Sequence, residues 1–189
     1  MTQQLTPYGK RAAAYGAAAT AVYLAMVLGS LAELEAISGL KPFDLRPMGY
    51  GPDEAQALLV SLGETGREFY VRYQLVLDTL YPALLALTLS NLFRLIGRGL
   101  GARKAVQVGV VLSWFSAGFD YAENIGIAAM LALWGDPPDA LVSATSLATV
   151  AKSVSTSIAV TALLGLLLWK LLSPRRPKPP VDAKVSMQR

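Results

Sequence analysis

Four ionisable residues interrupt long apolar stretches of the sequence: Asp78, Asp120, Glu123 and Lys152. An ionisable side chain inside a membrane-spanning helix costs roughly 2.5–3.5 kcal/mol, so such residues usually face the protein interior and have a partner or a function. Three carboxyl groups facing one amine leave at least one carboxyl protonated or hydrated. A carboxyl that exchanges a proton inside a cavity can act as a general acid or base. We therefore take Asp78, Asp120 and Glu123 as candidate catalytic residues.

Other polar residues recur on the same helix faces as these charges. Residues three or four positions apart share one face of a helix, which groups Asn124 with Asp120 and Thr149 and Thr156 with Lys152. On this basis the candidate ligand-binding residues are Arg67, Gln74, Tyr81, Asn124, Thr149, Lys152 and Thr156.

Pro82 follows Asp78 by four residues. Because proline has no amide hydrogen, it leaves the carbonyl of Asp78 without its helical hydrogen bond. We expect a kink in the helix beside this carboxyl group.

The composition excludes several kinds of active site. The chain contains no His and no Cys, which removes thiol nucleophiles, disulfides, haem-ligating histidine and the common zinc sites. It also lacks a glycine-rich phosphate loop. A Mg²⁺ ion held by Asp78, Asp120 and Glu123 is conceivable, but Lys152 competes for the same oxygens. We expect neither a metal nor a cofactor.

Helices long enough to cross a membrane must position these groups. The 189 residues are 53% hydrophobic and 16% charged, which is typical of a protein solvated by lipid. A span needs about 20 mainly apolar residues, and stretches 12–37, 69–96, 105–134 and 140–172 qualify. We predict an all-α fold in which residues 1–172 form a single four-helix transmembrane bundle.

The basic residues are concentrated on one side of the predicted spans. Most of the 17 Lys and Arg residues belong to this group: Lys10, Arg11, Arg94, Arg98, Arg103, Lys104, Lys170, Arg175, Arg176, Lys178, Lys184 and Arg189. The positive-inside rule therefore predicts both termini in the cytoplasm and a multi-pass protein of the cell (inner) membrane. Because these residues are divided among separate loops and do not line one exposed face, we expect no nucleic-acid partner.

The segments outside the spans have their own predicted structures. Outer loop 38–64 contains a short amphipathic helix, in which Leu58, Leu59 and Leu62 share one face and Gly63 ends the helix. Residues 173–189, rich in Pro, Lys and Arg, are expected to form a disordered basic tail attracted to anionic lipid. An alternative makes the first span a cleavable signal peptide, because Ser30-Leu31-Ala32 resembles a cleavage site, although the stretch is long for one.

The strings Asp78-x-x-Tyr81-Pro82 and Asp120-Tyr-x-Glu123-Asn124 resemble those of an uncharacterised bacterial family of four-span membrane proteins. The resemblance covers about residues 41–152 and implies a four-span fold without assigning an activity. In architecture alone, four helices around buried acids are also loosely similar to EXPERA-type sterol isomerases and sigma-2-like proteins.

The leading functional prediction is an acidic cavity within the membrane, open to the outer side. It would bind a lipophilic or amphipathic small molecule and isomerise or cyclise it by acid–base chemistry. One alternative is a small proton-coupled transporter, since carboxylates and a lysine can relay protons. Another is a structural or partner-binding membrane subunit. Membrane lipids are expected partners, and a homo-oligomer or a second membrane protein remains open.

Overall fold

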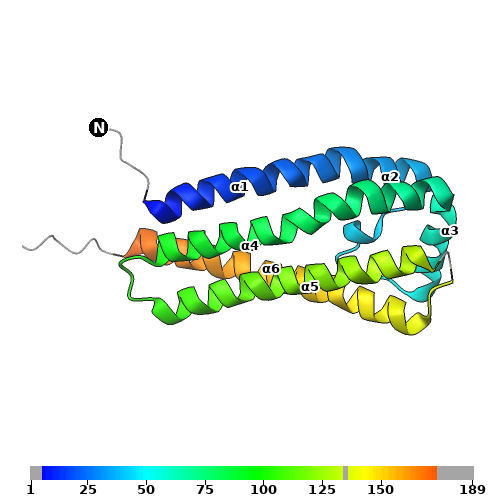
Figure 1. Cartoon of the computed structure of the whole chain (residues 1–189). Helices are drawn as coiled ribbons and strands as arrows, with labels where there is room; N and C mark the ends of the chain where they lie inside the picture. Colours follow the sequence, from blue (N-terminus) through cyan, green and yellow to red (C-terminus); the bar gives the residue numbers. More distant parts are fainter. Residues whose placement is uncertain (1–5, 134–135, 174–189) are drawn as a thin grey trace, which may run out of the picture.

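The computed structural model describes residues 6–133 and 136–173, and within these ranges every regular element is helical. Four long helical stretches run side by side along one axis (Figure 1). Their elements are α1 Pro7–Ala25, η1 Met26–Ser30 and α2 Leu31–Ser38; α3 Pro52–Phe69, η3 Tyr70–Gln74 and α4 Leu75–Gly97; α5 Arg103–Ala132; and α6 Asp139–Leu172. The all-α prediction is confirmed. These stretches cover the four predicted spans except for Leu133, which lies in a turn after α5, and Trp134, which lies outside the described residues, as does the predicted basic tail after Ser173.

Three of the four stretches are long and apolar enough to cross a membrane: Pro7–Ser38, Pro52–Gly97 and Asp139–Leu172. The fourth, α5, has 30 residues and would extend about 45 Å at 1.5 Å per residue. Its composition is less apolar because Asp120, Glu123 and Asn124, together with serines and glycines, lie within it. These three polar residues are buried against neighbouring helices.

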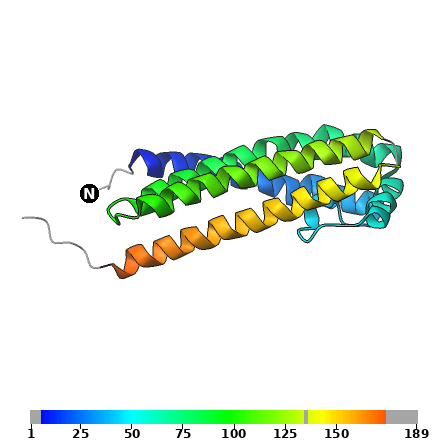
Figure 2. The same cartoon turned by 90° about the horizontal axis from the view of Figure 1, so that it is seen from below.

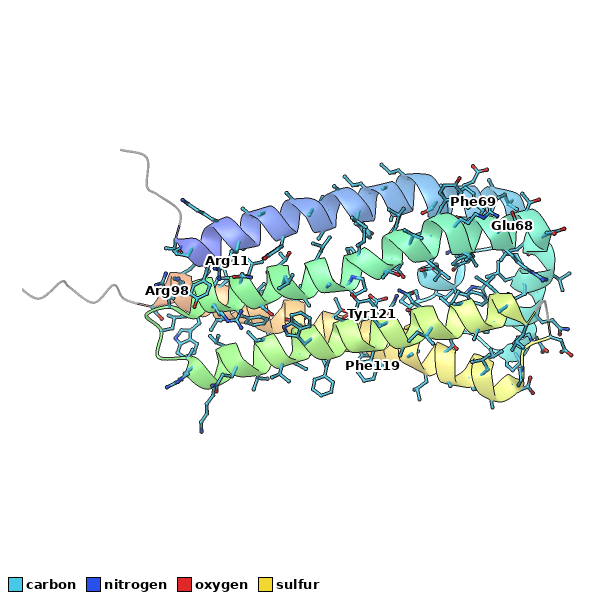
Figure 3. All side chains as sticks on the ribbon, in the orientation of Figure 1. Arg11, Glu68, Phe69, Arg98, Phe119 and Tyr121 are labelled. Atoms are coloured by element: carbon cyan, nitrogen blue, oxygen red, sulfur yellow. The ribbon has the colours of Figure 1, made fainter. Side chains whose placement is uncertain are left out.

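The two ends of the bundle differ in structure and charge (Figures 1 and 3). At one end, called here the basic end, α1 begins, α4 turns into α5 and α6 finishes; Figure 3 places Arg11 and Arg98 there. At the other, called the loop end, the chain passes through residues 39–51 and α3, and Glu68 lies there. The two views together show α6 running the full length between these ends (Figure 2).

The predicted amphipathic helix forms the first part of α3 and closes the loop end. Leu58, Leu59 and Leu62 are all buried, and they pack with Phe43 and Ile127 in an apolar cluster. Gly63 interrupts the helix with φ of 59° and ψ of −164°, a conformation accessible mainly to glycine. The chain therefore changes direction at Gly63 before it enters the long helix, as the sequence predicts.

Two π-helical turns, η1 and η3, were not predicted from the sequence. They lie in neighbouring helices and contact one another. A π turn inserts an extra residue into an α-helix, rotating the faces on either side, and such turns are frequent at functional sites.

Along the bundle axis, two apolar clusters enclose a polar layer. The first is the loop-end cluster around Phe43 and Leu58, and the second lies toward the basic end around Phe93 and Leu163. Helix α1 packs on α4, while α5 packs on both α4 and α6. Helices α1 and α6 are not among the pairs with extensive contacts, so the polar layer has an open flank between them.

Candidate functional site

A cavity of about 600 Å³ occupies this open flank. Tyr23 and Met26 line it from α1 and η1, and Thr156 and Val160 line it from α6. Its polar side is formed by four charged residues from four elements: Asp44, Asp78, Asp120 and Lys152. The cavity therefore combines apolar walls with a group of titratable side chains, as small-molecule sites commonly do.

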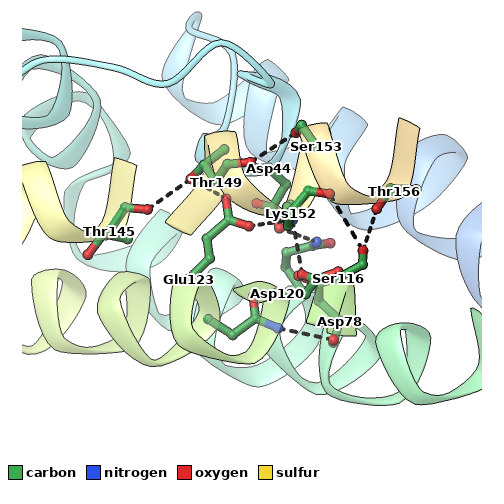
Figure 4. Close-up of polar contacts among 12 residues, drawn as sticks. Asp44, Asp78, Ser116, Asp120, Glu123, Thr145, Thr149, Lys152, Ser153 and Thr156 are labelled. Carbon is green, nitrogen blue, oxygen red and sulfur yellow. Dashed lines mark hydrogen bonds and ion pairs between the residues drawn. The ribbon is translucent and has the colours of Figure 1, made fainter. Parts of the chain in front are cut away.

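Lys152 is the centre of the polar layer (Figure 4). Its Nζ lies 3.0 Å from Oδ1 of Asp120 and forms a second ion pair with Oε2 of Glu123. Thr149, one helical turn earlier, donates a 2.7 Å hydrogen bond to Oε1 of Glu123. Glu123 is fully buried, whereas 16% of the Lys152 side chain is exposed, so the ammonium group is the more accessible partner. Lys152 thus contacts two of the three carboxyl groups selected from the sequence, Asp120 and Glu123.

Asp78 lies on the cavity side of α4 and is only 2% exposed. Its Oδ2 atom is buried without a hydrogen-bond partner. The backbone carbonyl of Asp78, which Pro82 deprives of its helical donor, instead accepts a 3.1 Å hydrogen bond from Nδ2 of Asn124. Asn124 therefore fastens α5 to α4 beside Asp78, and the Asp78 carboxyl is left facing the cavity.

Asp44 is the charged cavity residue that the sequence analysis did not select. It belongs to η2, Phe43–Leu45, a single 3-10 turn in the loop between α2 and α3. Its carboxylate accepts hydrogen bonds from the hydroxyl of Tyr70 and, at 3.0 Å, from Nε2 of Gln74. Gln74 in turn accepts a 2.6 Å hydrogen bond from Ser30. Ser30 ends η1 and Gln74 ends η3, so the two π turns together hold the loop in the bundle.

Part of the predicted outer loop 38–64 thus lines the cavity. Leu45 and Pro47 line the cavity beside Asp44. Nearby, the backbone N–H of Tyr50 donates a 2.8 Å hydrogen bond to Oγ of Ser146 on α6. Burial raises the pKa of the Tyr50 phenol above its ordinary value, and the Glu123 carboxylate raises it further, which keeps this loop residue protonated.

The predicted site residues fall into three groups. Asp78, Tyr81, Asp120, Lys152 and Thr156 line the cavity. A second group lies behind the cavity and contacts its lining: Glu123 pairs with Lys152, Asn124 donates to the Asp78 carbonyl, and Gln74 donates to Asp44. Thr149 also belongs to this group and donates to Glu123.

Arg67 lies apart from the cavity, among the residues of the loop end. Its Nε and Nη2 atoms donate to the carbonyl of Leu59 at 3.1 and 2.9 Å. The η3 turn between Arg67 and Asp78 explains this position, because it breaks the regular spacing that grouped the two on one face.

Within the described residues, no group of three or more acidic side chains has the arrangement of a metal site. Two of the buried carboxylates, those of Asp120 and Glu123, are instead paired with the Lys152 ammonium. The arrangement is suited to moving a proton or to stabilising a positive charge on a bound molecule.

Comparison with known proteins adds no relative: the chain matches no protein-family model, no curated protein and no solved structure.

Proposed function

We propose that the protein crosses the membrane four times, with both termini in the cytoplasm, and that its cavity binds a lipophilic or amphipathic small molecule. The three apolar helical stretches and the length of α5, which lies between α4 and α6, support four crossings. The concentration of Lys and Arg at the basic end supports the orientation. The cavity is then within the membrane, and the gap between α1 and α6 gives lipophilic molecules a lateral path to it.

The observation that carries the proposal is the position of buried acids in an otherwise apolar cavity. Asp78, Asp44 and Asp120 all line it. The Oδ2 atom of Asp78 has no hydrogen-bond partner in the protein, so it is the carboxyl oxygen from which a proton can be given to a bound molecule. Asp78 is then the acid that protonates the ligand, for example at a carbon–carbon double bond. Asp120, held by Lys152, stabilises the positive charge that develops and accepts a proton in return.

This proton exchange leaves the composition of the ligand unchanged, so the product is an isomer or a cyclised form. The alternative of a proton-coupled transporter needs a polar path to the basic end. The cluster around Phe93, Leu163 and Leu166 occupies that region, which favours chemistry in the cavity over transport through it.

The first experiment identifies the molecule that copurifies with the protein. Ser157→Trp places a large ring in the cavity, whereas Val154→Trp on the same helix points outside it and serves as the matched control. Mass spectrometry of organic extracts should detect a compound with the wild type and Val154→Trp but not with Ser157→Trp. Identical extracts from all three proteins would contradict a ligand in this cavity.

The second experiment tests the chemistry with the identified compound. The wild type should convert it into a product of equal mass and different chromatographic retention. Asp78→Asn should abolish conversion, and Asp120→Asn should reduce it strongly, while Ser90→Ala, remote from the cavity lining, should retain it. Full conversion by both acid-to-amide variants would refute the proposed mechanism and leave the binding role.

A further inference from the structure

A second cavity, of about 430 Å³, lies at the basic end. Three arginines line it: Arg94 from α4, Arg98 from the turn after α4, and Arg103 from the first residue of α5. Tyr8 of α1 and Gln107 of α5 complete its polar lining, and the Arg98 guanidinium lies 5.4 Å from the centre of the Tyr8 ring. Guanidinium groups converging on one cavity are suited to the oxygens of a phosphate group.

Among the described residues, no acidic side chain lies at the basic end to neutralise the arginines. The described segments 6–32, 79–119 and 153–173, which form that end, contain neither Asp nor Glu. Lys170 is already used by the fold, because its Nζ donates a 3.1 Å hydrogen bond to the carbonyl of Leu95 near the end of α4. The start of α5 adds partial positive charge, and no side chain caps it. The cavity therefore has a positive charge that an external anion must balance.

A separate apolar hollow of about 540 Å³ lies further along α5, and its lining begins at Val110, three residues after Gln107 of the arginine cavity. Arg103 and Gln107 are followed on the same helix face by Val111, Trp114 and Gly118, with spacings of three or four residues. Phe119, at the far end of the hollow, points away from the bundle in Figure 3. From Val110 to Ala122 the hollow extends about 18 Å at 1.5 Å per residue, close to the half-thickness of a hydrocarbon core of about 30 Å.

We propose that this composite surface binds one anionic phospholipid of the cytoplasmic leaflet. Its phosphate occupies the arginine cavity, and one acyl chain lies along the hollow beside Trp114 and Gly118. The proposal uses the membrane orientation proposed above but is independent of the acid–base cavity, with which it shares no lining residue. Charge complementarity, and the position of the apolar hollow after the arginine cavity on one face of α5, favour a lipid over a soluble anion, which would leave the hollow uncovered.

The test measures retention of lipid by the full-length protein in detergent, using native mass spectrometry. Phosphatidylglycerol is the anionic probe, phosphatidylcholine the zwitterionic probe and inorganic phosphate the soluble competitor. The test variant is Arg94→Gln/Arg98→Gln/Arg103→Gln. The matched control Lys10→Gln/Arg11→Gln/Lys104→Gln loses the same charge at the same end from residues that do not line the cavity.

We expect the wild type and the control to retain phosphatidylglycerol at least tenfold better than phosphatidylcholine, and the test variant to lose that preference. An equal loss of phosphatidylglycerol preference in the control would overturn the proposal, because general attraction between the basic end and an anionic lipid would then explain the preference. Gly118→Leu places a side chain in the hollow, and nothing lies within 4 Å of a Cβ atom added there, so this variant should fold. It should weaken phosphatidylglycerol retention several-fold.

Unchanged lipid retention in Gly118→Leu, combined with complete displacement by inorganic phosphate, would also overturn the lipid assignment. Asp78→Asn should leave phosphatidylglycerol retention unchanged. The outcome at the basic end is therefore separable from the outcome for the proposed function.

Discussion

The polar layer and the basic end hold α5 and α6 together in different ways. In the polar layer the two helices are joined by Lys152 with Asp120 and Glu123, and by a hydrogen bond between Ser116 and Thr156. Toward the basic end, the contacts are apolar, with Leu163 of α6 packed among Phe93 and its neighbours. Replacing a buried ion pair by apolar residues is often neutral or stabilising. The second region shows that this chain can pack α5 and α6 without charges, which supports the proposed role of the charges in the first.

The largest effect is expected from breaking the ion pairs of the polar layer. Lys152→Met removes the cation and leaves Asp120 and Glu123 buried without it, which should lower the free energy of unfolding by about 3–5 kcal/mol. Thermal unfolding in detergent measures this. Adding Asp120→Asn and Glu123→Gln should restore most of the loss, since no uncompensated charge then remains. Wild-type stability of Lys152→Met alone would show that the ion pairs do not hold this layer.

A smaller effect is expected where the loop joins the polar layer. Tyr70→Phe removes the hydroxyl that donates to Asp44, and a hydrogen bond to a charged group contributes about 1.5–3 kcal/mol. Hydrogen exchange of the Leu45 and Arg46 amides, which bond to carbonyls of Pro42 and Phe43, should accelerate by about tenfold or more. Tyr73→Phe, at an exposed tyrosine of the same π turn, is the control. Equal exchange in both variants would contradict the anchoring role of Tyr70.

The apolar region should instead respond to volume. A Cβ atom added at Gly109 would lie 2.3 Å from the ring of Phe93, whereas one added at Gly118 meets nothing within 4 Å. Gly109→Ala should therefore cost about 1–3 kcal/mol of stability through overpacking, and Gly118→Ala, the same change on the same helix, should cost none. Unfolding in detergent compares the two. Similar stability of both variants would show that α4 and α5 pack loosely here.

The smallest effect concerns the carbonyl of Asp78. Asn124→Ala removes its donor and should cost about 1 kcal/mol. Pro82→Ala supplies a backbone N–H to the same carbonyl, so Asn124→Ala should cost less in that background. A double-mutant cycle of unfolding free energies measures the coupling. Additive changes would mean that Asn124 and Pro82 act independently.

The contacts that helical periodicity controls could be predicted from the sequence. The extents of the long helices and the break at Gly63 follow from the apolar pattern and the turn residues. Helix faces selected Lys152, Asp120 and Glu123 as candidates, and the structure joins these three by ion pairs. Pro82 predicts that the Asp78 carbonyl lacks its helical donor. It does not predict that Asn124, which was selected only for its helix face, donates to this carbonyl.

The remaining contacts depend on irregular backbone. Nothing in the periodicity shows that the loop turns inward to bring Asp44 to Tyr70 and Gln74. The π turns η1 and η3 have no clear sequence signal, yet η3 alters the face on which Arg67 lies. The sequence therefore predicts the helices and their shared faces, while tertiary packing decides which residues complete the cavity.

The inward fold of residues 39–51 has a consequence for biogenesis. Gly49 adopts a φ of 85°, and a Cβ atom there would lie 2.6 Å from Oγ of Ser146, so the loop closes tightly on the beginning of α6. That helix is synthesised about a hundred residues later than the loop. The cavity consequently cannot be completed while only the first helices have been synthesised. In a truncated chain lacking α6 the loop should be sensitive to protease, and in the full-length chain it should be resistant.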